Sequence, residues 1–479
     1  MKKTKIVATL GPSTDDPEIL RAMLTAGLDV ARFNFSHGDH KSHKERVDSI
    51  RKICGAAGTT VALMADTKGP EIRLDVFRDG KVELTTGSSF TLTSDTVIGD
   101  TSRAGVSYAN LPREISPGAR ILLDDGLVEL LVESVSGADI ITRVTTGGVI
   151  SDRKGVNVPG IRLDIPYISA KDRSDLRFFI ENGFDIIAAS FVRSADDIRE
   201  MREELHRIDS DNKLKIIAKI ENAEGVKNAD SILSASDGLM VARGDLGVEL
   251  AYEELPIIQK DLIKNALRMG KSVITATQML ESMVNNPRPT RAETSDVANA
   301  IFDGTGAIML SGETAMGKYP VESLTAMARI AERIERNIDY RLLFAQSGYN
   351  PESSVTNAIS HATVTTAHDL NIAAILTVTM SGDTARNVAK YRPQCPIIAC
   401  TPSPVTQRQL KLVWGVIPLL TKEETDTTAL FNQAVDMALT CGYIKEGDLV
   451  VLTAGVPVGN SGTTNMLKVH VVGEKILAS

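Results

Sequence analysis

KIIAKIE, from Lys215 to Glu221, and GLMVARGDL, from Gly238 to Leu246, show the pattern that decides the fold of this chain. Each stretch is a short run of aliphatic and β-branched residues that ends in charged residues. Between such runs lie longer segments with the apolar spacing of a helix, such as VESLTAMARIAERIER from Val321. Strand-like runs that alternate with helical segments are typical of βαβ units, which build a parallel sheet.

Six further runs repeat this pattern and bring the candidate strands to eight. They are KIVATL from Lys5, DVARFNF from Asp29, TVALMADT from Thr60, DIIAASFV from Asp185, SVITATQML from Ser272 and AIMLSGET from Ala307. Eight successive βα units predict a (β/α)₈ barrel of the TIM type. We expect this α/β domain to comprise residues 1–69 and 168–340.

Two further regions depart from the barrel pattern. Residues 70–167 carry no helical period and contain alternating stretches punctuated by Gly and Asp, such as KVELTTG and ADIITRVTTGG. They predict an inserted β-barrel domain over the mouth of the main barrel. Residues 341–479 return to the βα rhythm, with AAILTVT, PIIACT, VIPLLT, DLVVLTAG and MLKVHVVG as candidate strands, and predict a C-terminal α/β domain.

Length and composition agree with this three-part organisation and narrow the class of protein. A chain of 479 residues predicts about three domains, and 43% hydrophobic residues suffice for a packed core in each. The net charge is −8, and the chain has neither a basic run nor a long apolar segment. We therefore expect no nucleic-acid or membrane partner. Four scattered cysteines without CxxC spacing favour a cytoplasmic location.

Polar residues stand at nearly every predicted strand end. Because the carboxyl ends of barrel strands meet on one face, these residues are the candidates for catalysis. The two-residue period of a strand places Arg32, Asn34 and Ser36 on one side of their strand, and Lys219 and Glu221 on one side of theirs. For a single strand end, capping of the following helix explains the polar residues equally well.

Lys219 is the strand-end residue that capping explains least. A lysine within an apolar run is costly to bury without an anionic partner. Glu221 and Asp245 follow neighbouring strands and have the oxygen ligands that Mg²⁺ prefers. With Arg32 they indicate a site for a phosphorylated anion, and the backbone N–H groups at Gly244 suit a carboxylate.

Six motifs, RFNFSHG, MADTKGPEIR, KIE, ARGDLG, TATQMLESM and MLSGETA, occur in this order. Through them the chain resembles the pyruvate kinase family, and the resemblance extends from Lys3 to the end of the chain. It implies phosphoryl transfer from phosphoenolpyruvate to ADP, giving pyruvate and ATP in glycolysis. It also implies dependence on Mg²⁺ (or Mn²⁺) and K⁺, a homotetramer, and a regulatory role for the C-terminal domain.

The resemblance implies roles for residues at matched motif positions. The implied catalytic residues are Lys219, Thr277, Ser311 and Arg32, and substrate would also contact Ser190, Gly244 and Asp245. The implied ligands are Glu221 and Asp245 for Mg²⁺, Asn34, Ser36, Asp66 and Thr67 for K⁺, and Asn34, Arg73, Lys171 and His37 for the nucleotide. Members with Glu in the GPEIR segment tend to require K⁺, and Glu71 places this chain among them.

A phosphorylated effector is implied in the C-terminal domain. The hydroxyl-rich turn with Thr379, Ser381, Gly382 and Thr384 precedes a predicted helix, whose N–H groups could bind a phosphate; simple capping is the alternative. The loop at 455–463 would complete the site. Family members activated by fructose bisphosphate commonly carry basic residues in these loops, where this chain has Met380, Val456 and Val458. We therefore expect a monophosphate effector.

Two motif-like patterns carry less weight. Residues 312–318 match the first seven positions of a P-loop, but Tyr319 replaces the metal-binding Ser or Thr. His37, His40 and His43 have no fourth ligand nearby, and a solvated helix start explains them better than a metal site.

Two rival functions stay open at this point. One is a phosphoenolpyruvate-type barrel enzyme of carbon–carbon bond chemistry, which would not need an inserted domain to cover a nucleotide. The other is a catalytically silent, metabolite-binding paralogue, against which the presence of Lys219, Glu221, Asp245 and Thr277 argues.

Overall fold

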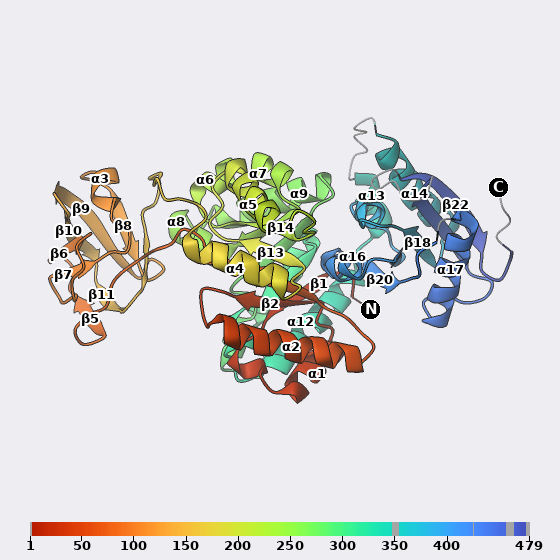
Figure 1. The fold of residues 1–479 in the computed structure, drawn as a ribbon, viewed down its shortest axis with the longest axis horizontal. Helices are drawn as coiled ribbons and strands as arrows, with labels where there is room; N and C mark the ends of the chain where they lie inside the picture. The colour runs from red at the N-terminus through yellow and green to blue at the C-terminus, as the bar shows by residue number, and fades with distance from the viewer. Residues whose placement is uncertain (1, 347–353, 425, 457–463, 476–479) are drawn as a thin grey trace.

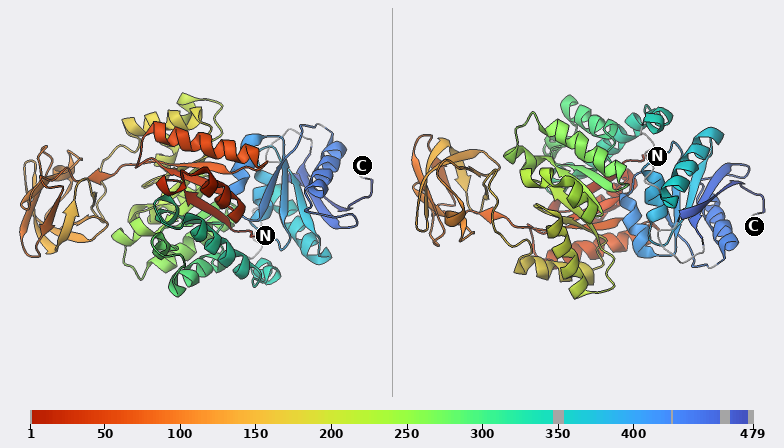
Figure 2. Two further views of the ribbon diagram at one scale, coloured as in Figure 1. Left: turned by 90° about the horizontal axis from the view of Figure 1, so that it is seen from below. Right: turned by 90° about the horizontal axis from the view of Figure 1, so that it is seen from above.

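The computed structural model describes residues 2–346, 354–424, 426–456 and 464–475, and these form three parts in a row. A central barrel separates a β-rich part, orange in Figure 1, from a C-terminal part in blue. Both views in Figure 2 keep the two outer parts at opposite ends of the barrel.

The central part is a closed barrel of eight parallel strands, as predicted. The strands are β1 (Lys5–Thr9), β2 (Val30–Asn34), β3 (Ala62–Asp66), β13 (Ile186–Ala189), β14 (Lys215–Ile220), β15 (Gly238–Ala242), β16 (Ser272–Ala276) and β17 (Ala307–Leu310). They follow one another around the barrel in chain order, and β17 closes it by pairing with β1. The strands after β3 lie beyond the insert in sequence, yet β13 pairs directly with β3.

Helices surround the barrel, with short 3₁₀ turns η1 (Pro12–Thr14) and η2 (Glu281–Val284) among them. The helices are α1 (Pro17–Ala26), α2 (His40–Ala56), α4 (Ala170–Glu181), α5 (Ala195–Ile208), α6 (Ala223–Lys227), α7 (Ala229–Ala235), α8 (Arg243–Glu249), α9 (Leu255–Arg268), α10 (Arg291–Phe302), α11 (Gly312–Ala315) and α12 (Pro320–Glu335). Strand alternation divides the core into two layers. On β14, Ile216 and Ala218 pack in the helix layer, whereas Ile217 joins the barrel interior. Lys219 therefore shares the inward face with Ile217.

The insert is a curled β sheet with its own core. Its elements are β4 (Ile72–Arg73), β5 (Lys81–Leu84), β6 (Ser89–Thr93), β7 (Arg103–Gly105), α3 (Leu111–Glu114), β8 (Arg120–Leu123), β9 (Val128–Ser136), β10 (Asp139–Thr146), β11 (Gly148–Ser151) and β12 (Gly155–Asn157). The seven-stranded sheet runs from β4 to β7, and β5 pairs separately with β11. Backbone bonds from Ser107 to Arg73 (2.8 Å) and from Asp75 to Gly105 (2.9 Å) join its two edges. The sheet thus approaches the predicted barrel shape.

The C-terminal part is a five-stranded sheet covered by helices. Its elements are α13 (Tyr340–Gln346), α14 (Val355–Leu370), β18 (Ala374–Val378), α15 (Asp383–Ala389), β19 (Ile397–Thr401), α16 (Pro404–Gln409), η3 (Leu410–Leu412), β20 (Val416–Leu420), α17 (Thr427–Thr440), β21 (Leu449–Gly455) and β22 (Thr464–Val471). The sheet order is β20-β19-β18-β21-β22, and only the last pair is antiparallel. All five predicted strands are present.

This C-terminal part docks on the end of the barrel where the strands begin. Leu412 of η3 belongs to the same buried cluster as the barrel interior and plugs this end. The Nε atom of Arg408, on α16, donates to the buried carboxylate of Asp185 at 2.7 Å, and Arg51 of α2 donates to the same carboxylate at 3.0 Å. Lys5 on β1 donates to the carbonyl of Val416 at 2.7 Å.

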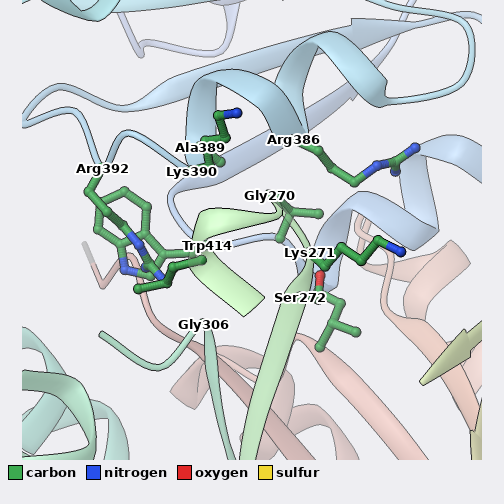
Figure 3. A pocket seen from close by; sticks show the side chains of 12 residues that line it. Gly270, Lys271, Ser272, Gly306, Arg386, Ala389, Lys390, Arg392 and Trp414 are labelled. Carbon is green, nitrogen blue, oxygen red and sulfur yellow. The ribbon is translucent and has the colours of Figure 1, made fainter. Parts of the chain in front are cut away.

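A pocket lies along this docking seam, far from the strand ends that carry the candidate catalytic residues. Figure 3 shows Arg392 against the ring of Trp414, at 4.3 Å, with Lys271 and Arg386 on the other side. Trp414 is 6% exposed and contacts Tyr340, so it belongs to the buried side of this seam.

The histidine pattern is the clearest local correction. His43 is not part of a solvated helix start: it is 3% exposed, stacks on Phe35 at 4.2 Å, and its Nε2 bonds to the carbonyl of His37. His40 stacks on Phe178. The aromatic rings that surround these histidines include side chains of α4, which lies far from them in sequence.

Among the described helices, none combines the length and apolar character needed to cross a bilayer.

Candidate active site

Lys219 stands at the centre of the polar groups that gather where the barrel strands end. Its Nζ atom lies 3.0 Å from Asp66 Oδ1, 2.8 Å from Glu221 Oε1 and 2.8 Å from Ser190 Oγ. The lysine and its three partners come from strands β14, β3 and β13 or from the residues directly after them. The anionic partners that the burial of Lys219 requires are therefore present.

Lys219 and Asp66 hold each other in the ionised state. Burial alone would lower the pKa of Lys219, but the carboxylates of Asp66 and Glu221 outweigh burial and raise that pKa well above its ordinary value. Burial would likewise raise the pKa of Asp66, but Arg32 and Lys219 hold it below its ordinary value. A fixed positive charge thus persists at Lys219 across the physiological pH range.

Arg32 is oriented by the same carboxylate. Its Nε donates to Asp66 Oδ2 at 2.7 Å and its Nη1 to Thr9 Oγ1 at 2.7 Å. Asp66 therefore bridges two buried cations and sets the distance between them. The strand period explains why Arg32 reaches this place, since Phe33 and Phe35 pack in the helix layer on the other side of β2.

Glu221 and Asp245 form a second acidic element beside Lys219. Burial raises the pKa of Glu221, and the Asp245 carboxylate adds to this rise although Lys219 opposes it. Burial also raises the pKa of Asp245, whose side chain hydrogen-bonds to Glu221. Asp245 disfavours the ionisation of Glu221, and a divalent cation bound between the two carboxylates would remove that repulsion, so the pair forms a natural site for such an ion.

The number of protein ligands agrees with such an ion. Two carboxylates leave most coordination positions to water and substrate oxygens, which is the arrangement that Mg²⁺ prefers. The residues therefore fit the predicted ion.

Thr277 follows β16 in an unusual backbone conformation. Its φ is 67° and that of Gln278 is 53°, both in the left-handed region, which non-glycine residues rarely occupy. The Thr277 hydroxyl accepts from the N–H of Gly244 at 2.8 Å and donates to the carbonyl of Ala276 at 2.6 Å. The start of α8 and the end of β16 are thus joined through this hydroxyl.

Other predicted residues lie at the strand ends and in the loops around this centre. Ser311, after β17, donates its backbone N–H to Glu313 Oε2 at 2.7 Å. Asn34 accepts from the N–H of Ser36, and Thr67 accepts from the N–H of Ser190. The bond between Thr67 and Ser190 holds the loop after β3 next to the lysine.

The predicted nucleotide residues are more exposed. Arg73, at the start of the insert, is paired with Glu71 at 2.7 Å and donates to the carbonyl of Arg153. Lys171 is half-exposed and bonds to Asp175 and to the carbonyl of Phe35. His37 is exposed.

The hydroxyl groups of the predicted effector turn already have hydrogen-bond partners within the protein. Thr379 accepts from the N–H of Gly382 at 2.9 Å, and Ser381 donates to Asp383 at 2.6 Å. Thr384 bonds to Thr464. Arg386, a basic residue that the sequence reasoning overlooked, contacts Asp383 and the carbonyl of Ser381. The second predicted loop, including Val458, lies largely outside the described residues.

Two residues near the site stand at predicted strand ends, but the sequence reasoning assigned no role to either. Glu313 is 1% exposed and accepts from the N–H groups of Ser311 and Leu280, so it joins the loops after β17 and β16. Arg243 is 9% exposed and donates to three successive carbonyls from Ala276 to Gln278. Arg243 lies in the motif ARGDLG and Glu313 in the motif MLSGETA. A charged residue at the end of an apolar strand was the sequence signal that could have indicated a role for each.

A closed parallel barrel with a buried lysine, an arginine and two paired carboxylates at its strand ends defines a class of enzyme. It is a barrel phosphotransferase that acts on a phosphorylated anion with the help of a metal ion.

The comparisons with known proteins identify the family. The model "Pyruvate kinase, barrel domain" matches residues 1–324, and "Pyruvate kinase, alpha/beta domain" matches residues 357–470. A pyruvate kinase of Geobacillus stearothermophilus is 51% identical over 99% of this chain and 81% of its own length. One of Clostridium acetobutylicum is 48% identical over 98% of this chain and 100% of its own. A pyruvate kinase crystal structure from Cryptosporidium parvum superposes with a TM-score of 0.92 at 39% identity, covering 98% of this chain and 96% of that one.

The chain belongs to the pyruvate kinase family. It is a glycolytic phosphotransferase that transfers the phosphoryl group of phosphoenolpyruvate to ADP and so produces pyruvate and ATP. Carbon–carbon bond chemistry and a silent paralogue, the two rival functions, are therefore set aside.

Proposed function

We propose that Lys219 and Arg32 bind the phosphoryl group during its transfer from phosphoenolpyruvate to ADP. The observation that carries this proposal is the cluster in which Asp66 bridges both cations while Glu221 and Ser190 hold the lysine. Phosphoryl transfer passes through a loose, negatively charged transition state, so fixed cations and accurate positioning supply most of the catalysis. No protein nucleophile is required.

Glu221 and Asp245 would hold Mg²⁺ or Mn²⁺. When bound, the ion neutralises charge on the substrate oxygens and the leaving group. The protein contributes the two carboxylates and keeps Glu221 buried and Asp245 partly buried beside Lys219, whose charge offsets one of them. The N–H groups at Gly244 and Asp245, at the start of α8, would bind the substrate carboxylate, for which the Gly244 N–H would exchange its present acceptor, the Thr277 hydroxyl.

Thr277 and Ser311 would act at the enolate side of the substrate. Thr277 would bind near the enolate oxygen, and Ser311 would belong to the relay that delivers a proton to the enolate carbon. The hydroxyl of Thr277 is held by Gly244 and Ala276, which limits the orientations that it can take.

Asn34, Ser36, Asp66 and Thr67 would form the K⁺ site, and Arg73, Lys171, His37 and Asn34 would contact the nucleotide. Glu71 supports a K⁺ requirement, because it pairs with Arg73 and reduces the positive charge available to the phosphates. A monovalent cation would restore that charge.

The C-terminal part, with Thr379, Ser381, Gly382 and Thr384, would bind a monophosphate effector in a cytoplasmic homotetramer.

We also propose that the chain divides into three domains: residues 1–69 with 168–340, residues 70–167, and residues 341–479. The separate sheets of the three parts support them.

A coupled assay for pyruvate tests the proposed site. Rates would be measured for the wild type and for Asp66→Asn, with and without Mg²⁺ and K⁺. We expect Asp66→Asn to lower kcat strongly, because Arg32 and Lys219 lose their shared carboxylate while the proposed Mg²⁺ ligands stay in place. Retention of the wild-type rate would contradict the central role of this cluster.

A further inference from the structure

Arg243 lies directly behind the left-handed turn at Thr277 and Gln278. It is 9% exposed, and its guanidinium donates from Nε to Ala276 O at 3.3 Å and from Nη2 to Thr277 O at 2.7 Å and Gln278 O at 3.3 Å. Three successive backbone carbonyls therefore accept from one side chain. A planar guanidinium can span them, whereas a lysine ammonium is a point charge.

The guanidinium is itself held from two neighbouring helices. Its Nη1 lies 2.7 Å from Asp296 Oδ1 on α10 and 3.4 Å from Gln259 Oε1 on α9. Its Nη2 also approaches Met279 Sδ at 2.9 Å. The position of the arginine is therefore set by the helix layer, and the turn takes its position from the arginine.

The turn needs such support. Left-handed backbone at two consecutive non-glycine residues is strained, and strained conformations persist only where the surroundings over-determine them. The residue after Arg243 completes the hold, because the N–H of Gly244 donates to the Thr277 hydroxyl at 2.8 Å. Arg243 thus bonds to the main chain of Thr277, and Gly244 bonds to its side chain.

We infer that Arg243 is a positioning residue that sets the orientation of the Thr277 hydroxyl for the reaction. This inference rests on the proposed role of Thr277 at the enolate. The Arg243 side chain is occupied by the carbonyls, Gln259, Met279 and Asp296, so it acts on the reaction through the turn and, as the first residue of α8, through the neighbouring Gly244 and Asp245. A double-mutant cycle with Thr277 isolates the part that passes through the turn. Small misplacements of a reacting group can cost up to about 10²-fold in rate.

The test is a double-mutant cycle between Arg243 and Thr277, measured as kcat and KM for phosphoenolpyruvate. Arg243→Lys keeps the charge but cannot span three carbonyls, and we expect kcat to fall by about 10- to 100-fold with a much smaller change in KM. In a Thr277→Val background the same substitution should change kcat by less than about threefold, because the hydroxyl that it positions is absent.

Arg392→Lys is the matched control. Arg392 is also buried, at 6% exposed, and donates to the carbonyl of Gly304 at 2.7 Å, but it lies at the other end of the barrel. We expect Arg392→Lys to lower the thermal midpoint while kcat stays within about threefold of that of its parent protein in both backgrounds.

Gln278→Gly provides a rescue that also covers poor folding of Arg243→Lys. Glycine adopts the left-handed conformation without strain, and the Gln278 side chain is exposed. In the Arg243→Lys protein, Gln278→Gly should restore folding and raise kcat. If Arg243→Lys folds only in combination with Gln278→Gly, the kcat of this double variant is compared with that of the Gln278→Gly single variant.

The outcomes separate this inference from the proposed function. A wild-type kcat in Arg243→Lys would overturn the positioning role alone. The positioning role alone would also be overturned if Arg243→Lys lowered kcat by an equal factor in the wild-type protein and in the Thr277→Val protein. A wild-type kcat in Thr277→Val would overturn the proposed role of Thr277, and the inference with it.

Discussion

The two ends of the barrel bury charge in different ways. At the carboxyl ends of the strands, Lys219, Arg32 and the three carboxylates form a cluster in which Glu221 and Asp245 are held with raised pKa values. At the opposite end, Asp185 is 0% exposed and accepts from Arg51, Arg408 and the N–H of Leu63 at 2.9 Å. In the first cluster two carboxylates, Glu221 and Asp245, hydrogen-bond to each other, whereas the second cluster satisfies its single carboxylate with donors of the protein.

The difference indicates what each end does. A buried charge whose partners are complete stabilises the attachment of one part of the chain to another. A buried cluster of cations and repelling carboxylates is costly unless a ligand completes it, and such clusters mark functional sites. Leu412 makes the contrast sharper, because it fills the barrel interior at the end where Asp185 lies.

The largest expected effect is the loss of catalysis in Lys219→Met. Removal of the cation from the transferring phosphoryl group should lower kcat by about 10²-fold or more while the circular dichroism spectrum is retained. Lys5→Met is the matched control at the other end, since Lys5 is also buried, bonds to Val416 O and lies 3.9 Å from Asp29. It should lower stability and leave kcat within a few fold. Near-normal kcat in Lys219→Met would contradict its assignment.

The second effect is on stability and comes from Asp185→Asn. Neutralising this carboxylate weakens its bonds to Arg51 and Arg408, and we expect the free energy of unfolding to fall by about 2 kcal/mol. Denaturant titration measures this change, with pyruvate formation assayed on the folded protein. A large loss of kcat without loss of stability would show that the two ends do not divide their roles in this way.

The third effect concerns the monovalent cation at the mouth. Replacement of K⁺ by a large organic cation at matched ionic strength should lower the wild-type rate at least about tenfold, equivalent to about 1.4 kcal/mol. Glu71→Lys should lose less, because it supplies a fixed positive charge and frees Arg73 from its pair. Equal wild-type rates in both salts would remove the K⁺ requirement.

The smallest expected effect is on regulation from the C-terminal part. Ribose 5-phosphate or AMP should lower the apparent phosphoenolpyruvate constant, with a coupling of about 1 kcal/mol, and fructose 1,6-bisphosphate should do so less. Ser381→Asp places a second carboxylate beside Asp383 and should abolish the response without changing basal kcat. Activation that survives in Ser381→Asp, or activation by the bisphosphate alone, would contradict this effector site.

Local reasoning predicted the features that depend on spacing along one strand. The two-residue period placed Arg32 and Asn34 on the face opposite Phe33 and Phe35, and the two phenylalanines pack in the helix layer. The same period explains why Lys219 and Glu221 lie together, 2.8 Å apart. The apolar run around Lys219 predicted that this lysine would need an anionic partner, and the structure places the carboxylates of Asp66 and Glu221 beside it.

Features that depend on distant residues were not predicted. The bridge through Asp66 joins Arg32 and Lys219, which are far apart in sequence, so no spacing rule reveals it. His43 was expected to be solvated, but the rings of Phe33 and Phe35 cover it. Arg243 was recognised only as part of a motif, because its partners in the turn after β16 and on α9 and α10 meet it only in the folded chain.

The sequence by itself determined the number and order of strands and helices, the two outer parts, the family and the identity of the polar strand ends. These follow from periodicity, composition and motifs, which are local properties of the chain. The tertiary structure decided which charges share a partner, that Asp185 joins the C-terminal part to the barrel, and that Arg243 supports the turn at Thr277. The physical reason is that electrostatic and hydrogen-bond energies depend on distance in space, and barrel closure brings together residues that the sequence separates.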